Sequence, residues 1–308
     1  MSSEPYLIRL TSRLAEGISR QPESFRSRHA NYLNACQNDD GGFGGRDPAS
    51  DLYYTGFGLR GLLLLGALTA ETADRAAGYL RSRLEGDASV VDFHSLLYSA
   101  AIIQSISGTD VLASAPADWP DRVADLLGRF RSADGGFGKT PEAKAGSTYH
   151  SFLTVLCYEM LGREAPEPEA LVQFVRTRQR DDGGFVEVAP MRRSGSNPTA
   201  AAVGILKILD ALDEITRTRV TEYLLAAQSS EGGIQANAVA PLADLLSTFT
   251  GCWTLLECGT LDQLDREAAR KYVRSLERPE GGFHGGVWDG GFDVEYTFYG
   301  LGSIALLE

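Results

Sequence analysis

The sequence lacks a basic surplus and a long apolar run, and each absence excludes a class of partner. Lysine and arginine number 29 against 41 aspartate and glutamate residues, which gives a formal net charge of −12. Nucleic acids and anionic membrane surfaces are bound through basic faces, so neither is expected as a partner. The most apolar run is the four leucines at 62–65. A transmembrane helix needs about 20 apolar residues, so no transmembrane segment is predicted.

The sequence contains no Cys-x-x-Cys pair, and no leader is expected. Four cysteines occur, at 36, 157, 252 and 258, and none forms a Cys-x-x-Cys pair. This usage fits a reduced protein better than a disulfide framework. Residues 1–5 have neither a basic region nor an apolar core, so no signal peptide is expected. A cytoplasmic location is therefore predicted.

What the sequence does have is one turn motif, repeated. Its first copy is the run Gln-Asn-Asp-Asp-Gly-Gly-Phe at 37–43, and the first glycine of each copy stands at 41, 135, 183, 232 and 281. The spacings are 94, 48, 49 and 49, and 94 is twice 47. A constant period is the signature of a repeat architecture. It also predicts a sixth, degenerate copy near position 88, at Glu85-Gly86-Asp87.

An amphipathic helix is predicted before each double glycine. Apolar side chains, with one histidine, recur there with i, i+3, i+4, i+7 spacing, at His29, Tyr32, Leu33 and Cys36; Val123, Leu126, Leu127 and Phe130; Val220, Tyr223, Leu224 and Ala227; and Ala269, Tyr272, Val273 and Leu276. One apolar face on a charged helix is typical of a helix on the outside of a protein. The copy before Gly183 departs from the pattern, because Arg178 takes the last position.

The double glycine itself is interpreted as the end of that outer helix. A glycine after a helix can adopt the left-handed conformation that other residues resist. The aromatic residue that follows is expected to pack the turn back onto the helix. The alternative, a phosphate-binding loop, would need a preceding strand and usually a lysine, and neither is evident.

A second helix of different character is predicted after each turn, over residues such as 54–66, 151–157 and 199–206. These stretches are apolar or small nearly all round, which is typical of a helix buried on both sides. A serine or threonine near the start suits an N-cap. Six outer and inner pairs give an all-α fold, an (α/α)6 toroid with a period of about 48 residues. We expect a single domain over 1–308, with 1–24 as an N-terminal helical extension and longer loops at 81–92 and 109–120.

The Gln-x-x-Asp-Gly-Gly-Phe turn resembles the repeat shared by protein prenyltransferase β subunits and the squalene/terpene cyclases. The resemblance covers residues 25–308 and is strongest from Asp244 to Leu301. That stretch is similar to the zinc-bearing half of a geranylgeranyl or farnesyl transferase β subunit. The resemblance implies an isoprenoid substrate and a separate helical partner subunit.

The family's functional residues transfer poorly. Of the family's three zinc ligands, Asp244 is present, but Leu246 stands at the cysteine position and Tyr296 at the histidine position. A catalytic zinc needs three protein ligands, so zinc is not expected. The four family positions that bind diphosphate hold uncharged residues, namely Gly195, Ala238, Pro241 and Ser247. The Asp-x-Asp-Asp acid motif of the cyclases is absent from the chain.

Candidate site residues are those at the starts of the inner helices, which a toroid gathers around one mouth of its cavity. Converging helix N-termini favour anions. The catalytic candidates are Asp244, Asp293, His150 and His94. The substrate-binding candidates are Tyr53, Tyr54, Phe57, Tyr149, Arg192, Arg193, Trp253 and Tyr296.

Each candidate also has a structural interpretation. Asp244 and Asp293 are either acid catalysts or Mg²⁺ ligands for a diphosphate, or they are helix caps like Asp51. The two histidines are either general acids and bases or buried neutral side chains. Arg192 and Arg193 are either an anion clamp or a solvated loop pair. The aromatic residues either line an isoprenoid cavity or fill the core.

Three functions fit these features. The first is an isoprenoid enzyme of the prenyltransferase or terpene cyclase type, without the family zinc, that binds a prenyl diphosphate or polyprenyl substrate. The second is a non-catalytic or repurposed toroid that binds a partner protein or a small molecule. The third is a sugar-active (α/α)6 barrel, for which Asp244 and Asp293 would supply the two carboxylates. The repeat favours the first.

Overall fold

A computed structural model describes residues 4–83 and 89–308 of the protein. The predicted sixth turn at Glu85-Gly86-Asp87 lies outside the described residues. The helices are α1 (Tyr6–Ser19), α2 (Glu23–Ala35), α3 (Leu52–Leu64), α4 (Ala70–Arg81), α5 (Val90–Ser107), α6 (Trp119–Gly128), α7 (Thr148–Met160), α8 (Pro168–Arg176), α9 (Ser196–Ile208), α10 (Glu214–Ala226), α11 (Leu245–Cys258), η1 (Leu261–Gln263), α12 (Arg266–Ser275) and α13 (Val294–Leu307). Strands β1 (His284–Gly286) and β2 (Asp289–Phe292) form an antiparallel hairpin. Within the described ranges, no helix has the length and apolarity of a membrane span.

The helices alternate in character along the chain, as the repeat predicts. Outer helix α10 buries Val220 and Leu224 and exposes Glu222, so it has one apolar face. Inner helix α9 buries every residue from Ala201 to Leu206, so it is enclosed on both sides. The outer helices α2, α4, α6, α8, α10 and α12 are each followed by an inner helix, which confirms the predicted helix-pair repeat.

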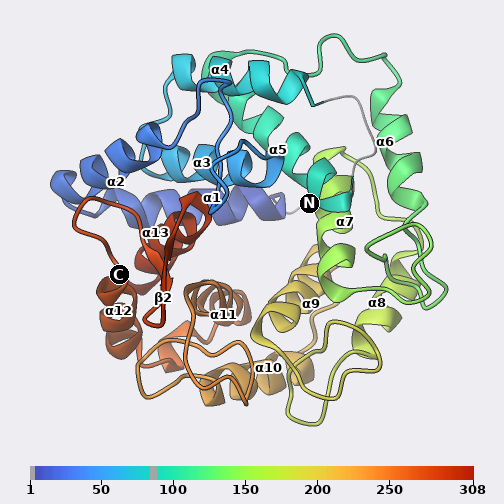
Figure 1. The fold of residues 1–308 in the computed structure, drawn as a ribbon. Helices are drawn as coiled ribbons and strands as arrows, with labels where there is room; N and C mark the ends of the chain where they lie inside the picture. The colour runs from blue at the N-terminus through green and yellow to red at the C-terminus, as the bar shows by residue number, and fades with distance from the viewer. Residues whose placement is uncertain (1–3, 84–88) are drawn as a thin grey trace. The chain divides into compact units, whose positions relative to one another are not determined.

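The chain forms two compact units. Unit 1 contains Pro120–Tyr272, together with the first residues to Leu7 and Leu307; unit 2 contains Ile8–Trp119, Val273–Leu306 and Glu308. In unit 1, α9 packs between α7 and α11, and in unit 2, α5 packs against α3 and α4 (Figure 1). Inner helices therefore pack on inner helices within each unit. That the whole chain is one domain stays a prediction.

The double glycines do not end the outer helices, which corrects the sequence-based interpretation. Helix α2 ends at Ala35 with Cys36 as a right-handed C-cap, and Gly41 closes a separate turn by donating its N–H to the Asn38 carbonyl. Gly41 has φ of +89°, a conformation that favours glycine. The motif is therefore a left-handed turn beyond the helix.

The first glycine of each turn also touches the next outer helix. A Cβ at these positions would overlap a backbone carbonyl of that helix, in the pairs Gly41–Arg75, Gly135–Ala170, Gly183–Arg219, Gly232–Ala268 and Gly281–Arg28. Each pair lies within one unit. In the last pair, the turn before α13 meets α2, so the final repeat packs on the first.

The residue after the double glycine packs on the inner helix, and Phe283 also stacks on His29 of outer helix α2. A Cβ at Gly58 of α3 would overlap the ring of Phe43, and Gly300 of α13 meets Phe283 in the same way. The Phe43 N–H donates to Thr55 Oγ1 at 3.0 Å. The threonine near the start of α3 therefore binds the turn, while Asp51 provides the N-cap.

A buried histidine completes the contact between the last turn and the first repeat. His29 Nδ1 accepts the Gly282 N–H at 3.0 Å, and its Nε2–H donates to Glu277 at 3.3 Å. His29 is fully buried and stacks on Phe283. Burial, with smaller contributions from Arg28 and Arg274, lowers the pKa of His29 from 6.5 to about 3. The imidazole is therefore neutral in the folded protein.

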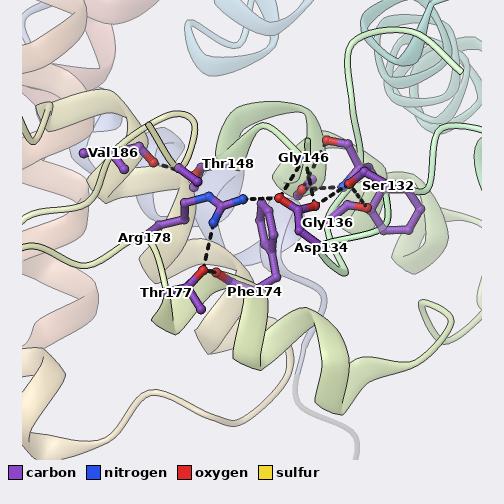
Figure 2. A network of polar contacts seen from close by, with 12 residues as sticks. Ser132, Asp134, Gly136, Gly146, Thr148, Phe174, Thr177, Arg178 and Val186 are labelled. Atoms are coloured by element: carbon purple, nitrogen blue, oxygen red, sulfur yellow. Dashed lines mark hydrogen bonds and ion pairs between the residues drawn. The ribbon is translucent and has the colours of Figure 1, made fainter. Parts of the chain in front are cut away.

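Arg178, the exception in the outer stripe, is itself buried and belongs to a polar network in unit 1 (Figure 2). Its guanidinium pairs with Asp134 of the preceding turn and lies 4.2 Å from the centre of the Phe174 ring. Asp134 also accepts from Ser132 Oγ at 2.6 Å and from the Gly146 N–H at 3.0 Å. Burial opposes ionisation of Asp134, but these bonds outweigh it and lower the pKa of that carboxyl. The ion pair between Arg178 and Asp134 thus connects two repeats at a position where the other copies have apolar side chains.

The turn glycines and an exposed helix glycine should respond oppositely to alanine. Gly183→Ala should lower the free energy of unfolding by more than about 2 kcal/mol, because it combines a φ of +92° with overlap on Arg219. Gly78→Ala, at an open position in α4, should raise it by about 0.5–1 kcal/mol. Urea denaturation of both variants measures this. Equal effects would contradict the assignment.

His29 should make the protein less stable in mild acid. The unfolded chain binds a proton at His29 below pH 6.5, whereas the folded chain does so only near pH 3. Stability from this group is therefore present above pH 6.5 and is lost as the pH falls, by about 2 kcal/mol between pH 7 and 5. His29→Gln can keep both hydrogen bonds and should lose about 2 kcal/mol less over that range. Identical pH slopes in urea denaturation would refute this role.

Candidate functional site

The structure distributes the predicted site residues over the two units. Unit 2 holds Tyr53, Tyr54, Phe57, His94, Asp293 and Tyr296, and unit 1 holds Tyr149, His150, Arg192, Arg193, Asp244 and Trp253.

The two candidate catalytic aspartates make capping bonds. Asp244 caps α11 by accepting the Ser247 N–H at 2.7 Å and the Ser247 hydroxyl at 2.8 Å. Asp293 caps α13 by accepting the Tyr296 N–H at 2.9 Å. Burial raises the pKa of both carboxyls, and the capping bonds oppose that rise. Their geometry is that of helix caps, the structural alternative.

An aromatic cluster lies on α3 and α13 in unit 2. The Phe57 ring centre lies 4.8 Å from that of Tyr53, 5.5 Å from Phe298 and 5.3 Å from Tyr299, all in edge-to-face contact. Phe57 comes from α3 and the last two from α13, so the first and last inner helices meet through these rings. Edge-to-face contacts leave ring faces for other groups.

Glu295 is the acid of this cluster. It accepts the Tyr53 hydroxyl at 2.6 Å and the Tyr299 hydroxyl at 3.2 Å. Burial raises the pKa of Glu295; the Tyr53 bond opposes the rise, and Asp293 adds to it. A carboxyl with a raised pKa that lies among phenols is suited to proton transfer.

Arg60 is a member of the cluster that the sequence reasoning missed. Its guanidinium carbon lies 3.9 Å from the ring centre of Phe57, 4.9 Å from that of Phe298 and 5.4 Å from that of Tyr98. Its Nε–H donates to the Gly56 carbonyl at 2.9 Å, which fixes the plane of the group. The sequence signal that could have identified Arg60 is that it is the one cationic residue in the otherwise apolar stretch 52–65.

His94 lies on α5 beside this cluster and is buried. Burial, with Arg60 as a second cause, lowers the pKa of His94 from 6.5 to about 3. Its Nε2 has no hydrogen-bond partner among the described residues. His94 is thus a neutral imidazole with a vacant nitrogen.

Tyr296 lies at the edge of unit 2, under the β-hairpin. Its hydroxyl accepts from Arg46 at 2.9 Å, and Arg46 also pairs with Asp289 of β2. Tyr54 packs against Gly45 in the same loop. These contacts hold the loop and the hairpin over the start of α13.

His150 in unit 1 joins a polar group that includes Glu187. The Ser147 hydroxyl is bonded to Glu187 and lies 2.8 Å from His150 Nδ1. A carboxylate only accepts, so the serine proton goes to Glu187 and His150 Nδ1–H donates to the serine oxygen. The His150 Nε2 lone pair is then available. Burial, with Lys139 as a second cause, lowers the pKa of His150.

The other unit 1 candidates differ in their surroundings. Trp253 is buried, and its indole N–H donates to the Tyr6 hydroxyl at 2.7 Å. Tyr6 also meets Phe152 edge to face at 5.5 Å. Tyr149, Arg192 and Arg193 are exposed, the arginines in the loop before α9. Trp253 therefore belongs to a packed aromatic group, and the arginine pair lies in solvent.

The residues at the family's zinc positions do not fit a zinc ion. Both oxygens of Asp244 accept from Ser247, Leu246 offers no donor atom, and the Tyr296 hydroxyl is bonded to Arg46. No group of three histidine, cysteine or acidic side chains suited to a metal occurs in residues 4–83 and 89–308. No step through a metal is assigned.

The capping role of Asp244 can be separated from a catalytic one. Asp244→Ala should lower the free energy of unfolding by about 1–2 kcal/mol, because it removes the cap. Asp244→Asn retains an acceptor and avoids a buried charge, so it should cost less than about 1 kcal/mol. Urea denaturation at pH 7 distinguishes the variants. An unchanged stability in Asp244→Ala would contradict the role.

Two plant proteins are similar to part of this chain in sequence. Protein farnesyltransferase subunit beta of Pisum sativum is 26% identical over 200 residues, covering 62% of this chain and 46% of that protein. The Arabidopsis thaliana subunit is 24% identical over 191 residues, covering 60% of this chain and 38% of that protein. The chain thus spans less than half the length of these relatives.

Solved structures share the fold at low identity. Candida albicans protein geranylgeranyltransferase-I, complexed with GGPP, superposes with a TM-score of 0.73 at 16% identity, over 91% of this chain and 90% of that one. A variant of the type II terpene cyclase MstE from Scytonema, in complex with geranylgeranyl dihydroxybenzoate, gives a TM-score of 0.63 at 15% identity over 98% of each chain.

The sequence model of one family accounts for nearly the whole chain. It matches residues 23–79, 72–240 and 237–308. The repeat, the turn and these matches agree, and they confirm the all-α toroid fold and the resemblance to prenyltransferase β subunits. The chain belongs to the family of the prenyltransferase alpha-alpha toroid domain.

Proposed function

We propose that this protein handles isoprenoids and holds the hydrocarbon part of a prenyl compound against Tyr53, Phe57, Phe298 and Tyr299. The observation that carries the proposal is the group of four rings on α3 and α13, with the Arg60 guanidinium over the rings of Phe57 and Phe298. Aromatic faces bind polarisable hydrocarbon, and they stabilise positive charge. A surface that holds a guanidinium can also stabilise a developing carbocation.

The relatives support the substrate class. The Candida albicans structure contains GGPP, and the Scytonema cyclase variant contains geranylgeranyl dihydroxybenzoate. Both ligands carry a long prenyl chain. We infer that this chain takes an isoprenoid of similar length.

Two side chains could move a proton in a reaction of the prenyltransferase or cyclase type. Glu295 is bonded to two tyrosine hydroxyls, and His150 has an available Nε2. Glu295 lies in unit 2 and His150 in unit 1, and each would exchange a proton with a substrate held by the aromatic residues of its own unit. Asp244 and Asp293 act as caps in this proposal. Mg²⁺ and a helical partner subunit stay predictions.

A non-catalytic binding protein is the second candidate. Both carboxylate oxygens of Asp244 accept hydrogen bonds from Ser247, and Leu246 and Tyr296 stand at the other two zinc-ligand positions of the family. These observations favour a non-catalytic role. In that case, the aromatic cluster would bind an isoprenoid without converting it. Product analysis after incubation with a bound prenyl compound separates the two functions.

Isothermal titration calorimetry with farnesyl diphosphate, geranylgeranyl diphosphate and farnesol tests the proposal. We expect at least one of them to bind. Phe57→Leu keeps an apolar side chain but removes the ring, and should weaken binding about threefold to tenfold. Phe25→Leu, on outer helix α2 of the same unit, is the matched control and should bind as the original protein does. Absence of binding by all three compounds, or no effect of Phe57→Leu, would overturn the proposal.

A further inference from the structure

The terminal nitrogens of Arg60 have no protein partner among residues 4–83 and 89–308. The side chain is half-buried, and its Nε is committed to the Gly56 carbonyl. In the described part of the chain, its two Nη groups make no hydrogen bond and no ion pair. The faces of the guanidinium are covered by rings, the nearest being Phe57 at 3.9 Å. Its N–H donors therefore point along the plane, in the geometry of a fork for an oxyanion.

Two buried polar groups on α5 lie beside this fork without partners. Ser99 is 1% exposed and His94 is 8% exposed, and neither Ser99 Oγ nor His94 Nε2 has a hydrogen-bond partner among the described residues. Leaving such groups unpaired costs about 1–3 kcal/mol each, so their vacancy indicates a ligand.

Gly56 brings Ser99 and the fork of Arg60 to one place. A Cβ built on Gly56 would lie 3.4 Å from Ser99 Oγ and 3.6 Å from Arg60 Nη2. Ser99 Oγ and Arg60 Nη2 therefore lie next to the same side of α3, at the position where Gly56 has no side chain. The Tyr98 ring links the remaining members, with its centre 5.4 Å from the Arg60 guanidinium and 6.0 Å from the His94 ring. All of these residues belong to unit 2.

We propose that Arg60, Ser99 and His94 bind a carboxylate group carried by an isoprenoid or a similarly apolar molecule. The inference deepens the proposed function and rests on it, since the same aromatic cluster would hold the apolar part. Ser99 donates its hydroxyl proton to the anion, and the His94 Nε2–H tautomer donates a second. The fork of Arg60 supplies the charge.

The charge balance favours a carboxylate over a diphosphate. Arg60 is the cation at the centre of the cluster, and the buried Glu295 carboxyl lies close enough to interact with it electrostatically. A diphosphate would bring several negative charges toward one guanidinium and one acid. A carboxylate brings one charge, and its two oxygens match the guanidinium fork.

Calorimetric titration with three compounds that share one tail tests the proposal. Farnesoate, farnesol and farnesyl diphosphate differ only in the head group. The original protein should bind farnesoate at least about tenfold more tightly than farnesol. Farnesol binding reports the apolar tail alone, so it tests the proposed function independently. Equal affinity for farnesoate and farnesol, or tighter binding of farnesyl diphosphate than farnesoate, would overturn the carboxylate site.

Variants of this site sharpen the test. Gly56→Ala should weaken farnesoate about tenfold or more while leaving farnesol within about twofold, and Arg60→Gln should weaken farnesoate to a similar extent. Gly56→Ala places a methyl group at ordinary contact distance from both Ser99 Oγ and Arg60 Nη2. Alanine also favours a helix more than glycine does, so this variant should fold even if Arg60→Gln does not. Arg83→Gln, an exposed arginine of the same unit, is the control and should bind farnesoate normally. Unchanged farnesoate binding in Gly56→Ala would refute the site.

Discussion

The close approach of a turn glycine to the next outer helix is the constraint on which the rest of the fold depends. In each of the five described turns, the space for a Cβ is filled by a backbone carbonyl, as at Gly183 and Arg219. Backbone contact of this kind is insensitive to the side chains of the outer helix. This contact sets the distance between neighbouring repeats. The aromatic ring that follows the glycines then positions the inner helix, as Phe43 does by packing on Gly58 of α3.

Much of the fold could be predicted, because periodicity is a local property. The stripe Val220, Leu224 and its equivalents predicted the outer helices, and the apolar run after each turn predicted the inner ones. The function of the glycine turn was misjudged, since its contact with the carbonyl of Arg219 spans two repeats. Arg178 broke the stripe for a reason equally remote, because its partner Asp134 lies in the preceding turn.

The candidate site was harder to predict. Position along the inner helices drew attention to Tyr53 and Phe57, and the structure brings their rings into contact, while their role in binding stays a prediction. The sequence reasoning did not select Arg60 and Glu295 as candidate site residues. Their contacts join α3 and α13, which are distant in sequence and adjacent in the fold. For the aspartates, the sequence left two uses open, because a carboxylate at a helix start suits both capping and catalysis. The structure adds the capping bonds to Ser247 and Tyr296, and a catalytic role stays a prediction.

Photocrosslinking tests the central claim, that the aromatic cluster of α3 and α13 is the isoprenoid-binding surface, most directly. A farnesyl analogue with a diazirine on its tail would be irradiated with the protein, and the labelled peptides identified by mass spectrometry. The account predicts labels on the peptides that contain Phe57 and Phe298, with competition by unlabelled farnesol. Labels confined to outer helices such as α2 or α10, or labels that farnesol does not displace, would contradict it.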